Sequence, residues 1–379
     1  MGEMGEIGEM GALGEMGDSI VADAGGTDDG FVALPVRAVV RDTDDSVVVE
    51  FDTTGRPMTF VHGQHLTLRR RFDDVEVRRS YSICSAAPDG ALRVAIKHVP
   101  GGVFSTWAVK ELRPGDAVDV LAPAGHFTHE LEPSTARRYA LIAAGSGITP
   151  VFSIAATVLE HEPHSVVDLL YVNRTSLSTM LLDELHDLRD RHLGRLRINF
   201  AFTREDTGGE LLSGRPDRHR LDALIEAGFV RSDADHAFLC GPIELITEAE
   251  AALVAAGMAP ERVHREIFTT NQPGQARMAP QDIVDQSIVA TGTATLHGRT
   301  STFEVYDGDS VLDAVQRVRP DAPFSCRSGV CSTCQAVLRN GEVEMAVNYG
   351  LTDDEVTRGY VLTCQSSPTT DRLDVDYDA

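Results

Sequence analysis

Three of the chain's six cysteines lie within nine residues, and this cluster constrains the fold more than any other feature of the sequence. The stretch "CRSGVCSTC" places Cys326, Cys331 and Cys334 in the spacing C-x4-C-x2-C, and Cys364 follows further along the chain. So few cysteines in 379 residues do not make a disulfide scaffold. We therefore expect the clustered thiolates to bind metal in a reducing compartment, by default the cytoplasm.

The spacing separates two kinds of metal site. A [2Fe–2S] cluster needs four thiolates, and the C-x4-C-x2-C spacing with one distant cysteine is the plant-type pattern that holds it. A four-cysteine zinc site is the alternative, but zinc sites usually pair two short C-x2-C units, whereas Cys364 stands alone. The sequence favours an iron–sulfur cluster with four ligands: Cys326, Cys331, Cys334 and Cys364.

Charge excludes one class of partner. The chain has a net charge of −24, and residues 285–379 hold fifteen acidic residues against seven arginines. A nucleic-acid-binding protein needs a basic surface, so nucleic acid is not expected as a partner. The acidic C-terminal region could steer a basic partner protein, or could simply keep the chain soluble. No apolar run is long enough to cross a membrane, so no membrane association is expected.

The pattern of apolar runs changes along the chain, and these changes predict several domains. The chain length also suggests more than one domain. Short β-type runs from "FVALPVRAVV" to "AVDVLAP" predict an antiparallel β-barrel. Apolar runs such as "RYALIAAG" and "SVVDLLYV" then alternate with helical stretches, which predicts an α/β domain with a parallel sheet. The predicted boundaries are a disordered Gly/Glu-rich tail over 1–30, the barrel over 31–133, the α/β domain over 137–268, a linker over 269–284 and a compact α+β domain over 285–379.

The C-terminal domain resembles plant-type ferredoxins over its whole length. The shared features are a Gly-Asp turn, a helix before the cysteine loop and a strand after it, within "DGDSVLDAVQRVRPDAPFSCRSGVCSTCQAVLRNGEVEM". The resemblance implies a β-grasp fold.

The barrel region resembles the FAD-binding domain of the ferredoxin–NADP reductase superfamily. The run "RSYS" matches its R-x-Y-S motif, which implies that Tyr81 packs on the isoalloxazine, Ser82 bonds near flavin N5 and Arg79 pairs with the pyrophosphate. In "VPGGVFSTWA", two glycines before a predicted helix start offer backbone N–H groups to the pyrophosphate. The further FAD-binding candidates in this region are Lys97, Val99, Gly101, Gly102 and Ser105. Trp107 is interpreted as a packing residue.

The α/β region carries the nucleotide motifs of the same superfamily. "AAGSGITP" follows a predicted strand and precedes a helix, and it matches the G-x-G-x-x-P turn that holds the NAD(P) pyrophosphate. "CGP" matches the element beside the nicotinamide, although a buried structural cysteine is the alternative, and "REIF" matches the motif that closes the domain near the flavin edge. The residues implicated are Gly145, Gly147, Thr149, Pro150, Cys240, Gly241, Pro242, Glu266 and Phe268. Of these, Cys240 and Glu266 are catalytic candidates together with Ser82.

The choice of nucleotide depends on charge beside the ribose. An acidic residue there favours NADH, whereas arginine accepts the 2′-phosphate of NADPH. Arg174 in "YVNRT" and Arg204 in "FTRE" follow two predicted strands, so the sequence favours NADPH and leaves NADH possible. Both arginines could equally be solvated loop residues.

The order of the motifs predicts an electron-transfer reductase. Electrons would pass from NADPH through FAD and the [2Fe–2S] cluster to an external acceptor, because no oxygenase metal motif occurs in this chain. The run "VEMAVNYGLTDDEVTRGYVLTCQ" resembles the reductase component of ring-1,2-phenylacetyl-CoA epoxidase, which implies a di-iron epoxidase partner and a role in phenylacetate degradation. Reductases of Rieske-type oxygenases such as 3-ketosteroid 9α-hydroxylase share the domain order and are the alternative. A redox module without flavin and an oxidase that does not need the cluster are two further alternatives.

Overall fold

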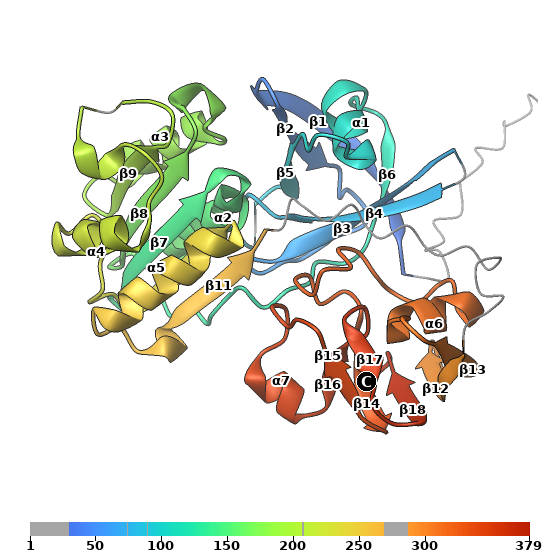
Figure 1. Ribbon diagram of the computed structural model, residues 1–379. Coiled ribbons are helices and arrows are strands. Elements are labelled where there is room, and N and C mark those ends of the chain that lie inside the picture. The colour runs from blue at the N-terminus through green and yellow to red at the C-terminus, as the bar shows by residue number, and fades with distance from the viewer. Residues whose placement is uncertain (1–29, 74, 89, 207, 269–286) are drawn as a thin grey trace, which may run out of the picture.

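The structure is a computed structural model that describes residues 30–73, 75–88, 90–206, 208–268 and 287–379. The predicted N-terminal tail up to residue 29 and the predicted linker over 269–284 lie outside these residues. The described chain forms three regions, each built on its own sheet and hydrophobic core (Figure 1).

The first region is a six-stranded antiparallel barrel with the strand order β4-β3-β6-β1-β2-β5. Its strands are β1 (Val32–Thr43), β2 (Ser46–Phe51), β3 (His65–Phe72), β4 (Val75–Ser82), β5 (Arg93–Lys97) and β6 (Ala117–Val120). A bridge between Ile83 and Val94 joins the two edges of the sheet and closes the barrel. Helix α1 (Val103–Lys110) places Phe104 and Trp107 in the barrel core, so Trp107 is a packing residue as predicted.

The second region is a parallel sheet with the order β11-β10-β7-β8-β9. Its strands are β7 (Arg138–Ala144), β8 (Val166–Asn173), β9 (Leu196–Phe202), β10 (His236–Gly241) and β11 (Val263–Ile267). The helices α2 (Ile148–His161) and α3 (Leu182–Arg191) pack on one face, and α4 (Arg218–Glu226) and α5 (Ile243–Ala255) pack on the other. The central strands β7, β8 and β10 are buried on both faces, which is why they appear in the sequence as continuous apolar runs.

The third region is a mixed sheet with the order β13-β12-β18-β14-β16, beside a two-stranded sheet of β15 and β17. Its strands are β12 (Ile288–Leu296), β13 (Arg299–Tyr306), β14 (Gln335–Asn340), β15 (Val343–Met345), β16 (Tyr360–Leu362), β17 (Ser366–Pro368) and β18 (Arg372–Asp376). Helices α6 (Val311–Val318) and α7 (Asp353–Thr357) complete this β-grasp domain. The three architectures confirm the predicted fold class, whereas the exact domain boundaries stay predictions.

Strands β3 and β4 form a two-stranded ribbon, the β3–β4 ribbon, that lies between the other parts of the molecule. In Figure 1 the ribbon runs between α1 on one side and the C-terminal domain on the other. The two strands pair antiparallel along their whole length, from His65 opposite Ser82 to Phe72 opposite Val75. The "RSYS" motif forms the C-terminal part of β4. The position of the ribbon therefore determines what the flavin motif can contact.

Candidate functional site

The three catalytic candidates, which come from two different domains, meet at one point. The Ser82 hydroxyl donates a hydrogen bond to Glu266 Oε2 at 3.3 Å, and Cys240 Sγ lies 3.9 Å from the same oxygen. Ser82 ends β4 of the barrel, whereas Cys240 and Glu266 are opposite one another on the parallel strands β10 and β11. The sequence separates these residues widely, and the contact between the two domains brings them together.

Burial alters the acid–base properties of this group. Removal from water raises the pKa of Glu266 to about 7, although the bond from Ser82 opposes the shift. Burial, with the nearby Glu266, also raises the pKa of the Cys240 thiol well above its usual value. Cys240 is therefore a neutral thiol at neutral pH. The Glu266 carboxyl can hold or release a proton near neutrality.

The flavin motif lies on the β3–β4 ribbon beside α1. The Tyr81 ring lies 5.7 Å from the Phe104 ring, measured between centroids, and burial raises the Tyr81 pKa, so its hydroxyl stays protonated. Arg79 is exposed, and its guanidinium donates to the Arg78 carbonyl at 2.6 Å. A ring on the ribbon with a surface arginine next to it fits a flavin and its phosphate.

The two-glycine turn is shaped by its own hydrogen bonds. The Gly102 N–H donates to the Val99 carbonyl at 2.8 Å, and the Val99 N–H donates to the Ser105 hydroxyl at 3.1 Å. Gly101 has φ +77°, and a Cβ on Gly102 would lie 2.7 Å from Ser105 Oγ. Helix α1 has no side-chain cap at Gly102, which leaves the N–H groups of its first turn available to a phosphate. Lys97 instead pairs with Asp45 at 3.5 Å, so its role in binding a cofactor stays a prediction.

The nucleotide turn is pressed against the end of β10. A Cβ on Gly147 would lie 2.2 Å from the Cys240 carbonyl oxygen, so only glycine permits this approach. Gly145 has φ +54° and open space where a side chain would be. Helix α2 begins without a side-chain cap, and Thr149 and Pro150 lie in its first turn. Open space beside uncapped backbone N–H groups fits a pyrophosphate.

The remaining nucleotide candidates surround this turn. A Cβ on Gly241 would lie 2.9 Å from the Ala144 Cβ, and Pro242 stands at the N-cap position of α5 without a side-chain capping hydrogen bond. The Phe268 N–H donates to the Gly241 carbonyl at 2.9 Å, which fixes the end of the domain beside "CGP". Arg174 and Arg204 are exposed after β8 and β9, and the Arg204 N–H donates to the Arg174 carbonyl at 2.8 Å. The structure thus brings the two arginines together at the carboxyl edge of the sheet.

The four candidate metal ligands lie in two pairs. The backbone N–H of Cys326 donates to Cys331 Sγ at 3.4 Å. Interaction with the Cys331 thiol lowers the pKa of Cys326, and interaction with the Cys334 thiol lowers the pKa of Cys364 in the same way. Within the described part of the chain, no three His, Cys, Asp or Glu side chains converge as a single metal ion requires. Two thiol pairs fit a two-iron cluster better than one zinc ion.

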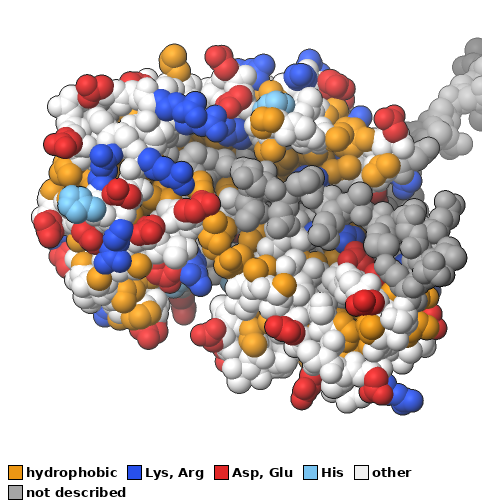
Figure 2. All heavy atoms as spheres, viewed as in Figure 1, with side chains coloured by type: hydrophobic (Ala, Val, Ile, Leu, Met, Phe, Trp, Pro, Cys, Tyr) orange, Lys and Arg blue, Asp and Glu red, His pale blue; other side chains and the backbone are white. Residues whose placement is uncertain are grey.

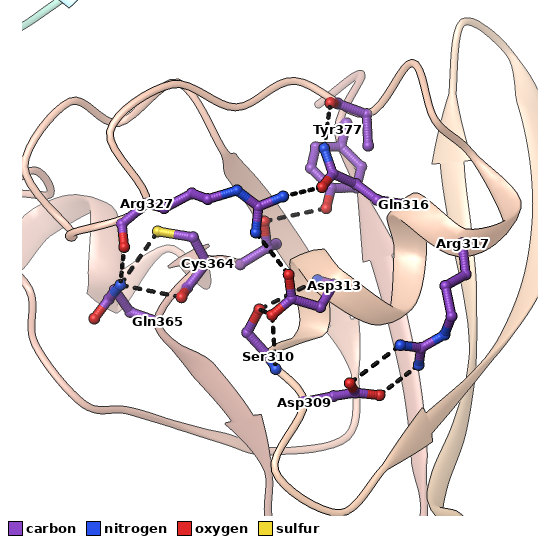
Figure 3. Close-up of polar contacts among 11 residues, drawn as sticks. Asp309, Ser310, Asp313, Gln316, Arg317, Arg327, Cys364, Gln365 and Tyr377 are labelled. Carbon is purple, nitrogen blue, oxygen red and sulfur yellow. Dashed lines mark hydrogen bonds and ion pairs between the residues drawn. The ribbon is translucent and has the colours of Figure 1, made fainter. Parts of the chain in front are cut away.

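The cluster loop, residues 324–334, is held by a network that the sequence analysis missed. Figure 3 shows Arg327 extending from this loop to helix α6, where its guanidinium bonds Asp313 at 2.6 Å and also Gln316. The Gln365 amide donates to the Arg327 carbonyl at 3.0 Å and lies 3.5 Å from Cys364 Sγ. Arg327 adopts φ +53°, unusual for a residue other than glycine. The only signal in the sequence was an arginine directly after the first cysteine.

Together these sites define a flavin- and iron–sulfur-dependent NAD(P)H reductase. Family models match an oxidoreductase FAD-binding domain over 34–129, an oxidoreductase NAD-binding domain over 141–251 and a 2Fe-2S iron-sulfur cluster binding domain over 294–369. The chain is 40% identical over 354 residues to one of the subunits of 1,2-phenylacetyl-CoA epoxidase of Escherichia coli (strain K12), and the match covers 92% of this chain and 98% of the relative. The chain belongs to this family of oxygenase reductase components.

Other relatives agree with this assignment. The chain is 33% identical over 362 residues to the ferredoxin reductase component of 3-ketosteroid-9-alpha-monooxygenase of Mycobacterium tuberculosis (strain CDC 1551 / Oshkosh), covering 92% of this chain and 97% of the relative. Among solved structures, phthalate dioxygenase reductase matches with a TM-score of 0.59 and 25% identity, over 92% of this chain and 98% of that one. A self-sufficient type IV cytochrome P450 monooxygenase matches with a TM-score of 0.65 and 25% identity, over 91% of this chain and 41% of that one.

These matches confirm the predicted electron-transfer function and its cofactors FAD, NAD(P)H and a [2Fe–2S] cluster. A bound flavin would supply acceptance of a hydride as two electrons and their release one at a time, which a one-electron centre requires. The protein's own contribution is to hold the sites described above. None of the described helices combines the length and apolarity that crossing a bilayer requires.

Proposed function

We propose that this chain is the reductase component of a phenylacetyl-CoA epoxidase system and delivers electrons to a di-iron epoxidase in phenylacetate degradation. The observation that carries the proposal is the 40% identity to the epoxidase component over nearly its full length, against 33% for the ketosteroid reductases. The "VNYGLTDDEVTRGYVLTCQ" run supports the same assignment, because it lies beside the cluster ligand Cys364. Clustered thiolates require a reducing compartment, which supports the cytoplasm as its location.

The acidic surface of the C-terminal domain supports a partner with a basic docking face. Figure 2 shows acidic side chains spread over the visible face of this domain, and Asp353 and Asp354 are exposed on α7. Charges of opposite sign on two proteins raise the rate of their encounter. Docking through this domain would let the acceptor approach the side of the cluster that the barrel leaves uncovered.

We also propose NADPH as the preferred nucleotide. Arg174 and Arg204 are adjacent and exposed, and neither has an ion-pair partner within the described residues. Two uncompensated guanidinium groups suit the 2′-phosphate that distinguishes NADPH from NADH. The kcat/KM ratio of the two nucleotides, compared between the native chain and Arg204→Ala, tests this assignment. A ratio that favours NADPH and falls in the variant supports it, and an NADH preference in the native chain contradicts it.

The proposed residue roles follow from the geometry. Arg79, Tyr81, Val99, Gly101, Gly102 and Ser105 would hold FAD, with Ser82 at its reactive edge. Gly145, Gly147, Thr149, Pro150, Gly241, Pro242 and Phe268 would hold NADPH, with Cys240 beside the nicotinamide. Glu266 would exchange a proton near this edge. Cys326, Cys331, Cys334 and Cys364 would ligate the cluster.

Copurification from native cells grown on phenylacetate tests the partner. The tagged reductase is expected to capture a di-iron oxygenase, and the purified pair is expected to couple NADPH oxidation to consumption of phenylacetyl-CoA. Capture of a Rieske-type oxygenase would instead make the ketosteroid-type alternative correct. Cytochrome c reduction at full rate after chemical removal of the cluster would contradict the electron path itself.

A further inference from the structure

The β3–β4 ribbon has two faces with different neighbours. In an antiparallel pair, residues that are directly opposite share a face, and successive residues alternate between faces. Tyr81 lies opposite Leu66, whereas the next pair, Ser80 opposite Thr67, projects to the other side. The Tyr81 face packs against Phe104 of α1. The opposite face of the same short stretch is therefore available to another domain.

That other face contacts the cluster loop directly. The Ser80 hydroxyl donates to the Ser325 hydroxyl at 2.8 Å, and Thr67 Oγ1 lies 3.4 Å from Thr333 Oγ1. Ser325 immediately precedes Cys326, and Thr333 immediately precedes Cys334. The loop that bears three of the four ligands is thus attached, at both ends, to the back of the strands that carry the flavin motif.

Burial of the two hydroxyl contacts restricts how the cluster loop can move relative to the ribbon. Ser325 and Thr67 are each only 3% exposed, so water cannot easily replace either partner. Beside them the Arg78 guanidinium lies 4.5 Å from the Phe324 ring centroid, and Arg78 is 2% exposed. A more distant contact, at 3.2 Å, joins the half-exposed His126 to the buried Glu355 of the same two domains. The hydroxyl contacts are the ones next to the ligands.

We propose that Ser80 and Ser325 are positioning residues for electron transfer, because their hydrogen bond docks the cluster loop on the flavin-bearing ribbon. Each transfer moves one electron with no bond made or broken, so the flavin loses one electron and the cluster gains one. In the docked arrangement, only the β3–β4 ribbon separates the cluster loop on the Ser80 face from the flavin motif on the Tyr81 face. Loosening it lengthens the path without altering either site. This inference does not depend on which oxygenase accepts the electrons.

The test uses Ser325→Ala and Ser80→Ala in the full chain loaded with FAD and cluster, with exposed Ser367→Ala as the matched control. Hydrogen–deuterium exchange of residues 324–334 reports docking without reference to activity. Loss of one buried hydrogen bond is expected to raise exchange there about fivefold. Anaerobic mixing with NADPH is expected to show slower cluster reduction by a similar factor. Ferricyanide reduction, which takes electrons from the flavin, should stay unchanged in Ser325→Ala.

The double variant separates a specific contact from two independent effects. If the two serines act through one bond, Ser80→Ala combined with Ser325→Ala should slow cluster reduction no more than either change alone. Additive losses, or cluster reduction and exchange as in the native chain in both single variants, would overturn the proposal. If Ser325→Ala loses iron, Ser80→Ala decides the matter, because Ser80 lies in the other domain.

Discussion

At the scale of single residues, Glu266 shows how a carboxyl group depends on two domains. Its pKa is raised to about 7 by burial against the barrel, so the folded protein keeps this proton up to near neutrality, whereas the unfolded chain loses it near pH 4.5. The unfolded state thus binds fewer protons between these values. Stability from this group is present below about pH 4.5 and is lost as pH rises toward 7.

Glu266→Gln is therefore expected to stabilise the protein most above pH 7. The substitution removes the free-energy cost of ionising Glu266 in the folded state. That cost is below about 3 kcal/mol, because the side chain is partly exposed. Thermal unfolding of the holoprotein should give a clearly higher Tm for the variant at pH 8 and a smaller gain at pH 5. Glu261→Gln, which changes an exposed carboxyl, is the control. An equal gain at both pH values would contradict the assigned pKa.

Cys364 allows a second prediction at this scale. Cys364→Ser removes one of the two thiols that pair with each other, so one iron would lose a thiolate. The purified variant is expected to lose most of its iron and acid-labile sulfide while keeping stoichiometric FAD. Cys84, a buried cysteine away from the loop, provides the control as Cys84→Ser. Full cluster content in Cys364→Ser would show that the fourth ligand lies elsewhere.

At the scale of elements, the turn between β7 and α2 depends on close backbone approach. Gly147→Ala would place a Cβ 2.2 Å from the Cys240 carbonyl oxygen, and backbone on both sides resists the shift. Overpacking of this kind costs about 1–3 kcal/mol. We expect a lower Tm and a KM for NADPH that rises more than kcat falls. Ser146→Ala, on the neighbouring residue, should leave both unchanged. A native KM in Gly147→Ala would mean that the turn does not hold the nucleotide.

The elements also show what the sequence could and could not predict. The strands β7, β8 and β10 were predicted because burial on both faces leaves a continuous apolar run. Strand β11 was recognised only as the "REIF" motif, because this edge strand is short and half exposed. The cluster ligands were predictable because three of them lie in one local loop. The Ser80–Ser325 contact joins residues far apart in the chain, so no local pattern encodes it.

At the scale of the whole molecule, two buried histidines make the barrel sensitive to acid. His62 and His65 are 3% and 4% exposed, and burial lowers the pKa of each to about 4. His62 bonds Thr128 at 3.1 Å, and His65 pairs with Ala124, so both lie against the segment that leads to the nucleotide domain. Neutral imidazoles are therefore built into the junction of the two domains.

The protein should lose stability as pH falls below about 6.5, because the unfolded chain then protonates both histidines and the folded chain does not. The loss approaches about 1.4 kcal/mol per pH unit for each group and levels off near pH 4, where the folded state is protonated too. Denaturant unfolding of the native chain between pH 7.5 and 5 should show this decline. His62→Gln should make it shallower, whereas His219→Gln, on an exposed residue, should not. A decline of equal slope in His62→Gln would mean that other groups, such as the paired carboxylates, cause the loss of stability at low pH. It would also mean that the junction tolerates a charged imidazole.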